Sequence, residues 1–368
     1  MNKSKKRVAI LFGGRSTEHQ ISLLSAKNVI GALDLEKFEP VLIGIDKKGR
    51  WHLNEGALKL MHADDPNKIS MAEEANVVLL SQNTNDHSLV KAGNWADAGK
   101  IDVIFPVLHG TYGEDGSVQG FAKLANLPCV GCGILGSAIG MDKDVTKRLL
   151  REAGIPVADF VTLRKHYNDH LTYAEVSEKL GSELFIKPAN LGSSVGVSFV
   201  NDEASYNKAI EHAFRFDPKV VVEEKLKGRE VECAVLGNMY PEASTVGEVI
   251  PRSSFYTFEN KYIDEGGAVL DIPAKLNADE VSRIQSLAIE TYRLLECEGM
   301  TRVDMFLTPE GNLYINEVNT IPGFTQISMY PKLWEISGLP YTELITKLIE
   351  LAIESNDNRN ALVQADSI

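Results

Sequence analysis

One stretch near the C-terminal end, residues 301–329, decides the fold; it reads TRVDMFLTPEGNLYINEVNTIPGFTQISM. Two runs of alternating residues flank residues 309–312 (PEGN), and a glycine-containing connection of this length is typical of a β-hairpin. If Thr308 pairs with Leu313, the register of the remaining pairs follows, because each step along one strand is matched on the other. The stretch therefore predicts two antiparallel strands with named partners.

This register places four polar side chains on one face of the predicted hairpin. Asp304 lies opposite Glu317. Arg302 lies opposite Asn319, and all four share a side because side chains alternate faces with a period of two. Two facing carboxylates repel each other, which favours a cation between them. Asp304, Glu317 and Asn319 offer the hard oxygen ligands that suit Mg2+, so the hairpin predicts a metal site for phosphoryl transfer. The alternative is a solvated polar face neutralised by Arg302 and a lysine.

Bulk properties indicate a soluble enzyme of ordinary composition. The chain has 368 residues, enough for two or three domains, with 44% hydrophobic and 24% charged residues. The net charge of −13 makes a nucleic acid an unsuitable partner. The apolar run at residues 8–12 is too short for a signal-peptide core, and no run reaches transmembrane length. We therefore expect a cytoplasmic protein with no membrane partner.

The four cysteines include one C-x-x-C pair, Cys129 and Cys132. A zinc site would need a second pair or nearby histidines, which the sequence lacks. We expect buried structural thiols, with a redox dithiol as the alternative.

Polar residues follow two predicted strands of the N-terminal part. A buried strand at residues 8–12 ends in Gly13-Gly14, and a helix is expected from about Thr17, with Thr17 and Gln20 as a capping box. This unit resembles a dinucleotide fold but lacks G-x-G-x-x-G. Glu18 then lies where α/β folds bind ligands, or it serves only the helix dipole.

A second strand, residues 101–108, leads directly into the glycine-rich loop HGTYGEDG that begins at His109. Its position at the carboxyl end of a strand favours a functional role for His109 as much as a structural one.

Two lysines are predicted near phosphates. Asp142 caps a helix that begins at Lys143, which puts a cation at the wrong end of the helix dipole unless an anion lies nearby. Lys187 ends a strand that precedes the glycine–serine loop at residues 189–197, whose N–H groups can lie over phosphates. The alternatives are a solvated Lys143 and a surface strand lysine at 187.

Two further segments carry candidate binding residues. Acidic residues in VVVEEKL (220–226) and at Glu230 flank a hairpin turn, where they bind adenine and ribose or are simply turn-flanking charges. Residues 251–267 form a long loop rich in aromatic residues, which is typical of a lid.

At this point the motifs resemble a known superfamily. The lysine-bearing strand, GSSVGV (192–197), VVVEEKL, RVD (302–304) and NEVN (316–319) are similar to the ATP-grasp superfamily. Four stretches narrow the resemblance to the D-alanine–D-alanine ligases of bacterial cell-wall synthesis; they read GGRSTEHQIS (13–22), HGTYGEDG (109–116), FYTFENKY (255–262) and NEVNTIPGFT (316–325). The resemblance spans residues 7–350.

The resemblance implies a three-domain α/β ATP-grasp fold with ATP held between two sheets. The expected domains are an N-terminal Rossmann-like parallel-sheet domain (1–126), a central domain (127–220) and a C-terminal domain (221–368) with the lid at 251–267. It also implies a homodimer.

The resemblance further implies a role for each candidate residue. ATP would be bound by Lys143, Lys187, Ser194 and Lys261, and its adenine and ribose by Glu223, Glu224, Leu226 and Glu230. Two Mg2+, or Mn2+, would be held by Asp304, Glu317 and Asn319. The first D-alanine would be held by Glu18 and His109, with Ser193 and Tyr262 joining Glu18 to close the lid. The reacting carbonyl oxygen would face Arg302 and the N–H of Gly323, and the second D-alanine would lie by Ser328 and Met329.

The implied reaction matches these residue types. ATP converts one D-alanine carboxylate into an acyl phosphate, and lysines with Mg2+ neutralise the transferred group. The amine of the second D-alanine then attacks, and the oxyanion needs fixed donors. The tyrosine of the lid loop favours D-alanine over D-lactate as the second substrate. A D-alanine–D-lactate or other D-residue ligase is the nearest alternative; a non-catalytic nucleotide-binding module and a simple kinase agree less well with the motifs.

Overall fold

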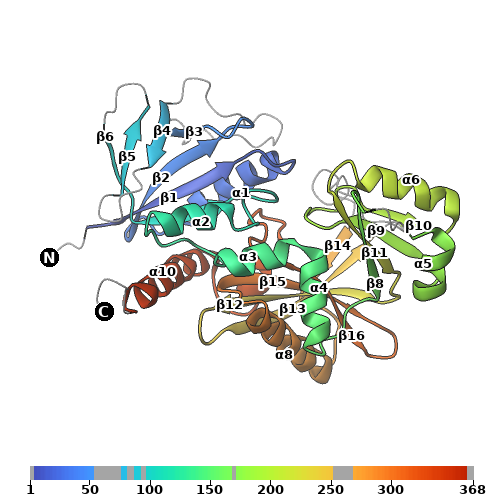
Figure 1. Ribbon diagram of the computed structural model, residues 1–368. Helices are drawn as coiled ribbons and strands as arrows, with labels where there is room; N and C mark the ends of the chain where they lie inside the picture. Colours follow the sequence, from blue (N-terminus) through green and yellow to red (C-terminus); the bar gives the residue numbers. More distant parts are fainter. Residues whose placement is uncertain are drawn as a thin grey trace.

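The computed structural model describes residues 4–53, 76–80, 87–92, 97–167, 171–251 and 268–362. Figure 1 shows an N-terminal α/β unit, a small α/β unit at the opposite side, and a larger sheet between and below them. The start of β1 and the end of α10, the described helix and strand nearest the two ends of the chain, lie on the same side of the molecule (Figure 1). Within the described ranges, no helix combines the length and apolarity needed to cross a membrane.

The N-terminal sheet has the strand order β6-β5-β4-β3-β2-β1-β7. Its elements are β1 (Lys6–Gly13), α1 (His19–Ala32), β2 (Phe38–Ile45), β3 (Trp51–Leu53), β4 (Asn76–Leu80), β5 (Ser88–Lys91), β6 (Asp97–Lys100), β7 (Val103–Val107) and α2 (Ser117–Leu124). The predicted parallel sheet is confirmed for β2, β1 and β7. Strands β3 to β6 extend this sheet by antiparallel pairing.

The start of α1 differs from the prediction. The helix begins at His19, with Glu18 at the N-cap position and no side-chain cap. The expected capping box of Thr17 and Gln20 is therefore wrong. The backbone N–H of Glu18 donates to Ser16 Oγ at 3.0 Å instead. The chain turns into the helix through Gly13 and Gly14, whose φ angles of 90° and 95° are accessible to glycine.

The small unit is a four-stranded sheet, β10-β9-β11-β8, with two helices. Its elements are β8 (Phe160–Arg164), α5 (Tyr173–Leu180), β9 (Leu184–Pro188), β10 (Ser198–Val200), α6 (Glu203–Ala213) and β11 (Lys219–Glu224). The expected domain boundary at residue 220 falls inside β11, which pairs with both β8 and β9. We propose that the boundary lies after Glu224.

The C-terminal sheet has the order β14-β13-β12-β15-β16. Its strands are β12 (Arg229–Gly237), β13 (Glu242–Pro251), β14 (Ala268–Asp271), β15 (Gly299–Leu307) and β16 (Leu313–Asn319), and its helices are α3 (Ile134–Met141), α4 (Lys143–Glu152), α8 (Ala278–Leu294), α9 (Met329–Ile336) and α10 (Tyr341–Asn360).

Alternation along β12 divides this sheet into two faces. Val231, Cys233 and Val235 pack into one hydrophobic core with α8, whereas Ala234 and Leu236 pack into another with α9 and α10. The second core also includes buried side chains of the N-terminal unit, so the two units share one apolar interior. This shared core fixes the N-terminal loops over the face that carries the even-numbered residues of β12.

The hairpin β15–β16 has the predicted pairs where the polar residues lie but not at its turn. Asp304 lies opposite Glu317 and Arg302 opposite Asn319, as expected. Near the turn, however, Leu313 pairs with Leu307 rather than with Thr308, and the register shifts between Asp304 and Met305. A five-residue turn closes the hairpin, with the N–H of Thr308 donating to the carbonyl of Asn312 at 2.9 Å.

A bulge at Asn316 makes up the difference of one residue between the two registers.

Close packing of α3 gives a stability prediction. A Cβ on Gly136 would lie 2.5 Å from the carbonyl oxygen of Glu296 and 3.2 Å from Cys297 Cα. We expect Gly136→Ala to destabilise the protein by about 1–3 kcal/mol, because the backbone of the neighbouring loop has to move. Gly120→Ala on α2 is the matched control, since its nearest neighbour is a side-chain methyl group at 3.8 Å.

Urea unfolding monitored by circular dichroism measures both variants. Equal midpoints for the two would contradict this description of the contact.

Candidate functional site

A network of charges lies on the face of the C-terminal sheet that carries the even-numbered residues of β12. It extends over the neighbouring hairpin β15–β16. Arg302 donates to both oxygens of Asp304, from Nε and Nη2, at 2.7 Å each. Arg302 Nε also lies 2.8 Å from Glu232 Oε2. The amide of Asn319 donates to Asp304 Oδ2 at 2.9 Å. Three of the four predicted residues are therefore in direct contact, and Glu232 of β12 joins them.

The fourth residue, Glu317, connects the hairpin to α4. Lys143 Nζ lies 3.3 Å from Glu317 Oε2 and donates to the carbonyl oxygen of Leu191 at 2.8 Å. Asp142 caps α4 through Val145 N, as predicted, and Lys143 is the first residue of the helix. The unfavourable position of this cation in the helix dipole is offset by Glu317 and by the loop carbonyl.

Lys187 on β9 lies beside the same group of charges. Its Nζ donates to Glu223 Oε2 at 2.8 Å and to Asn316 Oδ1 at 3.3 Å. Although burial disfavours the ammonium, the charge and hydrogen bond of Glu223 raise the pKa of Lys187 above its ordinary value. Lys147, one turn after Lys143, lies 3.4 Å from the other oxygen, Glu223 Oε1.

The remaining candidates for binding adenine and ribose lie at the end of β11, at the start of β12 and in the turn between them. Glu224 Oε1 accepts from the backbone N–H of Asp159 at 2.8 Å, so this side chain is tied to the backbone before β8. Leu226 and Glu230 are half-buried in and after the turn between the strands. These residues follow Glu223 in chain order, from the end of β11 to the start of β12.

Glu18 and Ser193 are joined across 175 residues of sequence. Glu18 is 6% exposed and accepts a hydrogen bond from Ser193 Oγ. Ser193 and Ser194 both have positive φ angles, 52° and 58°. Such angles cost energy for residues with a side chain, so the loop at 189–197 is held in its shape by its surroundings.

His109 connects three segments. Its ring nitrogens lie 3.0 Å from Ser25 Oγ and 3.2 Å from the carbonyl oxygen of Ile321. Although burial disfavours the imidazolium, the hydrogen bond and charge of Glu114 raise the pKa of His109 above its ordinary value. Ser25 Oγ also accepts from Phe324 N at 3.3 Å, so this cluster fixes the loop around Gly323.

Gly323, Ser328 and Met329 lie at the start of α9. A Cβ on Gly323 would lie 2.7 Å from Ser328 Oγ, so no larger residue fits without movement. Ser328 Oγ accepts from Thr325 N at 2.9 Å. The side chain of Met329 is buried in the core, so only its backbone is available to a ligand. Lys261 and Tyr262 of the predicted lid lie outside the described residues.

A narrow cleft brings these segments together. It is lined by Glu114 and α3–α4 residues on one side, Leu191 and Gly192 on another, and Glu317 to Thr320 on the third. A Cβ on Gly192 would lie 3.3 Å from Glu18 Oε2, which places the loop of the small unit directly against the N-terminal unit. One cation, Lys143, and two carboxylates, Glu114 and Glu317, therefore line the cleft, and the loop of the small unit closes its third side.

The donor set suits a divalent cation that also binds phosphate. No group of three or more His, Cys, Asp or Glu side chains that is placed to hold a metal ion is found within the described ranges. Asp304 and Glu317 lie opposite each other on the hairpin, next to Asn319. Mg2+ in nucleotide sites takes one or two carboxylates and completes its shell with phosphates and water, so two carboxylates and an amide oxygen fit it. Cys129 and Cys132 are free thiols.

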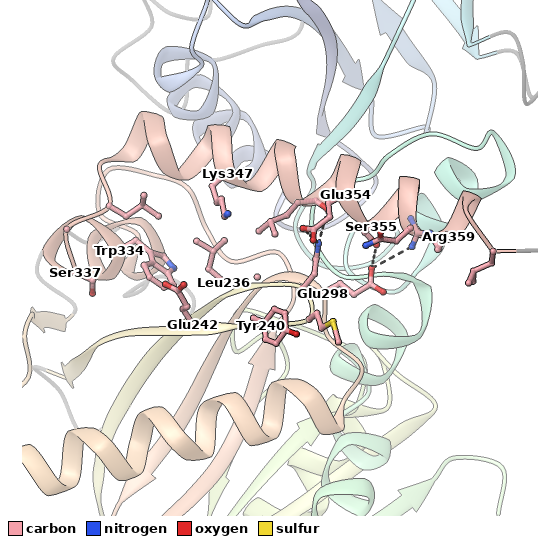
Figure 2. Close-up of a pocket in the computed structure, with 18 residues that line it drawn as sticks. Leu236, Tyr240, Glu242, Glu298, Trp334, Ser337, Lys347, Glu354, Ser355 and Arg359 are labelled. Carbon is pink, nitrogen blue, oxygen red and sulfur yellow. Dashed lines mark hydrogen bonds and ion pairs between the residues drawn. The ribbon is translucent and has the colours of Figure 1, made fainter.

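A cavity much larger than this cleft lies elsewhere. It has a volume of about 1050 Å³ and lies between α10, α9 and the turn after β12. Figure 2 shows Ser355 and Arg359 of α10 directed at Glu298, with none of the predicted site residues among its lining. The narrower cleft is the candidate site, because the charged groups converge there.

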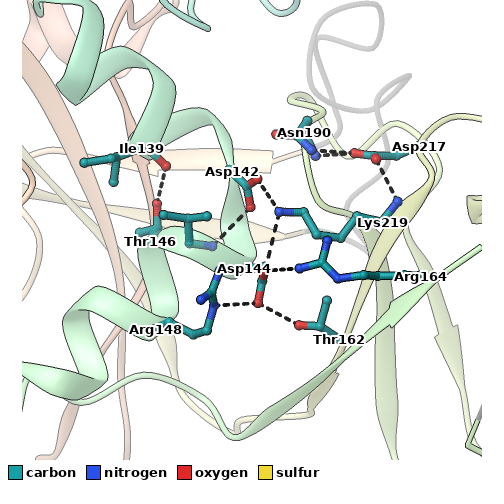
Figure 3. Close-up of polar contacts among 11 residues, drawn as sticks. Ile139, Asp142, Asp144, Thr146, Arg148, Thr162, Arg164, Asn190, Asp217 and Lys219 are labelled. Atoms are coloured by element: carbon teal, nitrogen blue, oxygen red, sulfur yellow. Dashed lines mark hydrogen bonds and ion pairs between the residues drawn. The ribbon is translucent and has the colours of Figure 1, made fainter. Parts of the chain in front are cut away.

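A second network attaches α4 to the small unit (Figure 3). Lys219 of β11 donates to Asp142. Asp144, 3% exposed, accepts from Thr162 Oγ1 at 2.8 Å and from Arg148 Nε and Nη2 at 3.1 Å. Because Lys143 lies between Asp142 and Asp144, this network holds its backbone in place.

Asp144 gives a pH-dependent prediction. Burial favours the neutral carboxyl, but hydrogen bonds from Thr162 and Arg148 hold its pKa below the ordinary value. A carboxyl whose pKa is lowered by folding stabilises the fold above its unfolded pKa of about 4, and this contribution is lost as the pH falls through the folded pKa. We expect Asp144→Asn to lower the free energy of unfolding by about 2 kcal/mol at pH 7.

The difference between wild type and this variant should shrink below about pH 4. Urea unfolding at several pH values measures it, with Asp279→Asn on α8, which is 81% exposed, as the control. A difference that stays constant from pH 7 to pH 3 would contradict the role given to Asp144.

Four residues of the site were absent from the sequence prediction: Glu232, Asn316, Lys147 and Ser25. Glu232 stands in a strand without any motif. Asn316 reaches Lys187 only through the bulge. Lys147 had a usable signal, since it lies four residues after Lys143 and therefore on the same face of α4.

Comparisons with known proteins agree with this geometry. The model described as "D-ala D-ala ligase N-terminus" matches residues 7–132, and "D-ala D-ala ligase C-terminus" matches residues 149–350. The D-alanine--D-alanine ligase A of Escherichia coli is 53% identical over 358 residues, 97% of this chain and 98% of that protein. The D-alanine--D-alanine ligase of Shouchella clausii is 53% identical over 359 residues, 98% of each.

Solved structures give the same result. The D-alanine-D-alanine ligase from Coxiella burnetii has a TM-score of 0.86 and 38% identity, with 97% of each chain covered. The VanG D-Ala:D-Ser ligase of Enterococcus faecalis has a TM-score of 0.84 and 39% identity, covering 95% of this chain and 100% of that one. The fold is the ATP-grasp fold that the motifs predicted. By sequence and by structure along nearly its whole length, this chain belongs to the D-alanine–D-alanine ligase family.

Proposed function

We propose that this protein joins two D-alanine molecules to D-alanyl-D-alanine at the expense of ATP, as a step in peptidoglycan precursor synthesis. The observation that carries the proposal is the cleft in which Lys143, Glu317 and Gly192 meet from three parts of the chain. Phosphate-binding cations, hard oxygen ligands and a buried acid for an amine are all within this region. The names of the relatives supply the substrates.

Three groups of residues bind the phosphates of ATP, its adenine and ribose, and the metal. Lys143 and Lys187, with Ser194 and Lys261, bind the ATP phosphates. Adenine and ribose are bound by Glu223, Glu224, Leu226 and Glu230. Asp304, Glu317 and Asn319 hold Mg2+, for which Mn2+ can substitute, and the metal supplies charge neutralisation on the transferred phosphoryl group.

Substrate positioning falls to the N-terminal and lid segments. Glu18 is a buried carboxylate suited to the ammonium of the first D-alanine, and Ser193 orients it. His109 lies by the carboxylate of that substrate, and Tyr262 completes the set with Glu18. Ser328 and the backbone of Met329, at the start of α9, face the carboxylate of the second D-alanine.

The reaction proceeds in two steps. A carboxylate oxygen of the first D-alanine attacks the γ-phosphorus of ATP, and ADP leaves with formation of an acyl phosphate. The free amine of the second D-alanine attacks the acyl carbon, and phosphate leaves with the electrons of its bond to carbon. Arg302 and the N–H of Gly323 stabilise the oxyanion, a contribution that is typically about 3–4 kcal/mol per donor.

A second candidate differs only in the second substrate. The likeness to the VanG D-Ala:D-Ser ligase, at 39% identity, keeps D-serine as an alternative acceptor, and D-lactate is the corresponding ester-forming one. The 53% identity to D-alanine--D-alanine ligases over nearly the whole chain favours D-alanine. We further propose a homodimer in the cytoplasm, which analytical ultracentrifugation and cell fractionation test.

Phosphate release from ATP tests the proposal. We expect release to require D-alanine and to equal the D-alanyl-D-alanine formed, with D-serine and D-lactate as second substrates giving less than one-tenth of the rate at about neutral pH. Phosphate release that is independent of D-alanine would overturn the proposed function. Faster reaction with D-serine would replace it with the second candidate.

A further inference from the structure

Lys147 is a buried cation without a hydrogen-bond partner among the described residues. Its side chain is 1% exposed, and Nζ lies 3.4 Å from Glu223 Oε1 without forming a hydrogen bond. Glu223 Oε1 is also buried and has no hydrogen-bond partner within the described ranges. Two buried charged atoms with unfilled hydrogen-bonding capacity are costly, because the protein groups around them leave that capacity unused. Such a pair indicates that a ligand completes it.

The two oxygens of Glu223 are held differently. Oε2 accepts from Lys187 at 2.8 Å, whereas Oε1 lies 3.4 Å from Lys147 Nζ. The two cations come from separate elements, β9 and α4, so together they set the plane of the carboxylate. Oε1 is consequently an oriented acceptor with a free lone pair.

The charges around Glu223 favour its ionised form. Burial alone would raise the pKa of Glu223, but the charges of Lys147 and Lys187 hold it below its ordinary value. Burial lowers the pKa of Lys147, and the charge of Glu223 opposes this without fully restoring it. An ionised Glu223 accepts hydrogen bonds and donates none.

We propose that Lys147 is a positioning residue for the nucleotide base, which aims Glu223 Oε1 at an N–H donor and so selects a purine with a 6-amino group over one with a 6-oxo group. A 6-amino group donates to the carboxylate. A 6-oxo group is an acceptor, so its oxygen would face Glu223 Oε1 with no proton to share between the two oxygens. The inference rests on the proposed function only for the identity of the nucleotide, and it does not require D-alanine chemistry.

Isothermal titration calorimetry with ATP and inosine triphosphate tests the inference without D-alanine. These nucleotides differ at position 6 and in the proton on N1. We expect wild-type protein to bind ATP at least about tenfold more tightly than inosine triphosphate. In Lys147→Met the ATP affinity should fall about tenfold, and the preference should fall to less than about threefold, because Glu223 turns toward Lys187. Lys147→Arg keeps the charge and should retain most of the preference.

Two further variants separate this role from general packing. Arg151→Met removes an exposed cation one turn along α4, 4.6 Å from the Phe160 ring that also lies near Lys147, and should leave both affinities unchanged. Adding Lys147→Met to Glu223→Gln should change the ATP affinity less than about twofold, because Lys147 acts through Glu223.

A Lys147→Met protein with the wild-type preference for ATP would overturn the inference, and so would additive effects of the two substitutions. If Lys147→Met fails to fold, Lys147→Arg and Glu223→Gln still give the comparison: equal preference in wild type and Glu223→Gln contradicts the inference. A protein that discriminates between the nucleotides but forms no dipeptide contradicts the proposed function instead.

Discussion

Replacing Glu317 by Gln is expected to lower kcat by a factor of about 10³ or more, a larger loss than any other single substitution in the site should cause. The amide is nearly isosteric with the carboxylate, so the hairpin keeps its shape. It removes the charge that faces Asp304 and pairs with Lys143 at 3.3 Å, so both the proposed metal and the lysine lose their partner. Initial rates of phosphate release at saturating ATP and D-alanine measure the loss.

A second readout makes this prediction independent of turnover. We expect the variant to bind Mg2+–ATP about tenfold more weakly than wild type in calorimetry, while metal-free ATP binds nearly equally. Glu310→Gln is the control, because Glu310 is exposed in the turn of the same hairpin. A Glu317→Gln protein with kcat within threefold of wild type would remove Glu317 from the metal site.

Arg302→Lys is expected to reduce kcat by about 10²–10³, with a smaller change in KM for ATP. The planar guanidinium contacts both oxygens of Asp304 and lies 2.8 Å from Glu232, and an ammonium cannot keep this geometry. The loss should appear in kcat, because the oxyanion that Arg302 is proposed to stabilise exists only after the acyl phosphate has been attacked.

The matched control is Arg283→Lys. Arg283 Nη2 donates to the carbonyl oxygen of Gly311, at the opposite end of the same hairpin, at 2.6 Å. This substitution should leave kcat unchanged. An Arg302→Lys enzyme that retains kcat and instead shows a raised KM for ATP would assign Arg302 to nucleotide binding.

The sequence predicted what depends on neighbouring residues. Arg302 and Asp304 share a face because of the period of a strand, whereas Asn319 lies opposite Arg302 only because of the bulge at Asn316. The cap of α4 by Asp142 follows from local hydrogen bonding. The parallel core of the N-terminal sheet follows from buried runs such as residues 8–12.

The errors and omissions have physical reasons of another kind. The bulge at Asn316 restored a register that the turn had shifted, and a bulge has no reliable local signal. Thr17 does not cap α1 because Glu18 occupies the N-cap position, where it is tied to Ser193 from a distant loop. Glu232 joins the site only because β12 lies beside β15, and Lys147 only because α4 packs against β11. Neither of these contacts between distant segments has a signal in the local sequence. The resemblance to a family, rather than periodicity, supplied the substrates.

Transfer of oxygen-18 tests the proposed reaction most directly. D-Alanine labelled with oxygen-18 in its carboxylate is supplied with unlabelled ATP, and the released phosphate is analysed by mass spectrometry. If an acyl phosphate forms, one labelled oxygen should appear in phosphate for each D-alanyl-D-alanine made, because the bond between carbon and the bridging oxygen breaks in the second step. Phosphate that carries no label while dipeptide accumulates would contradict the acyl-phosphate route.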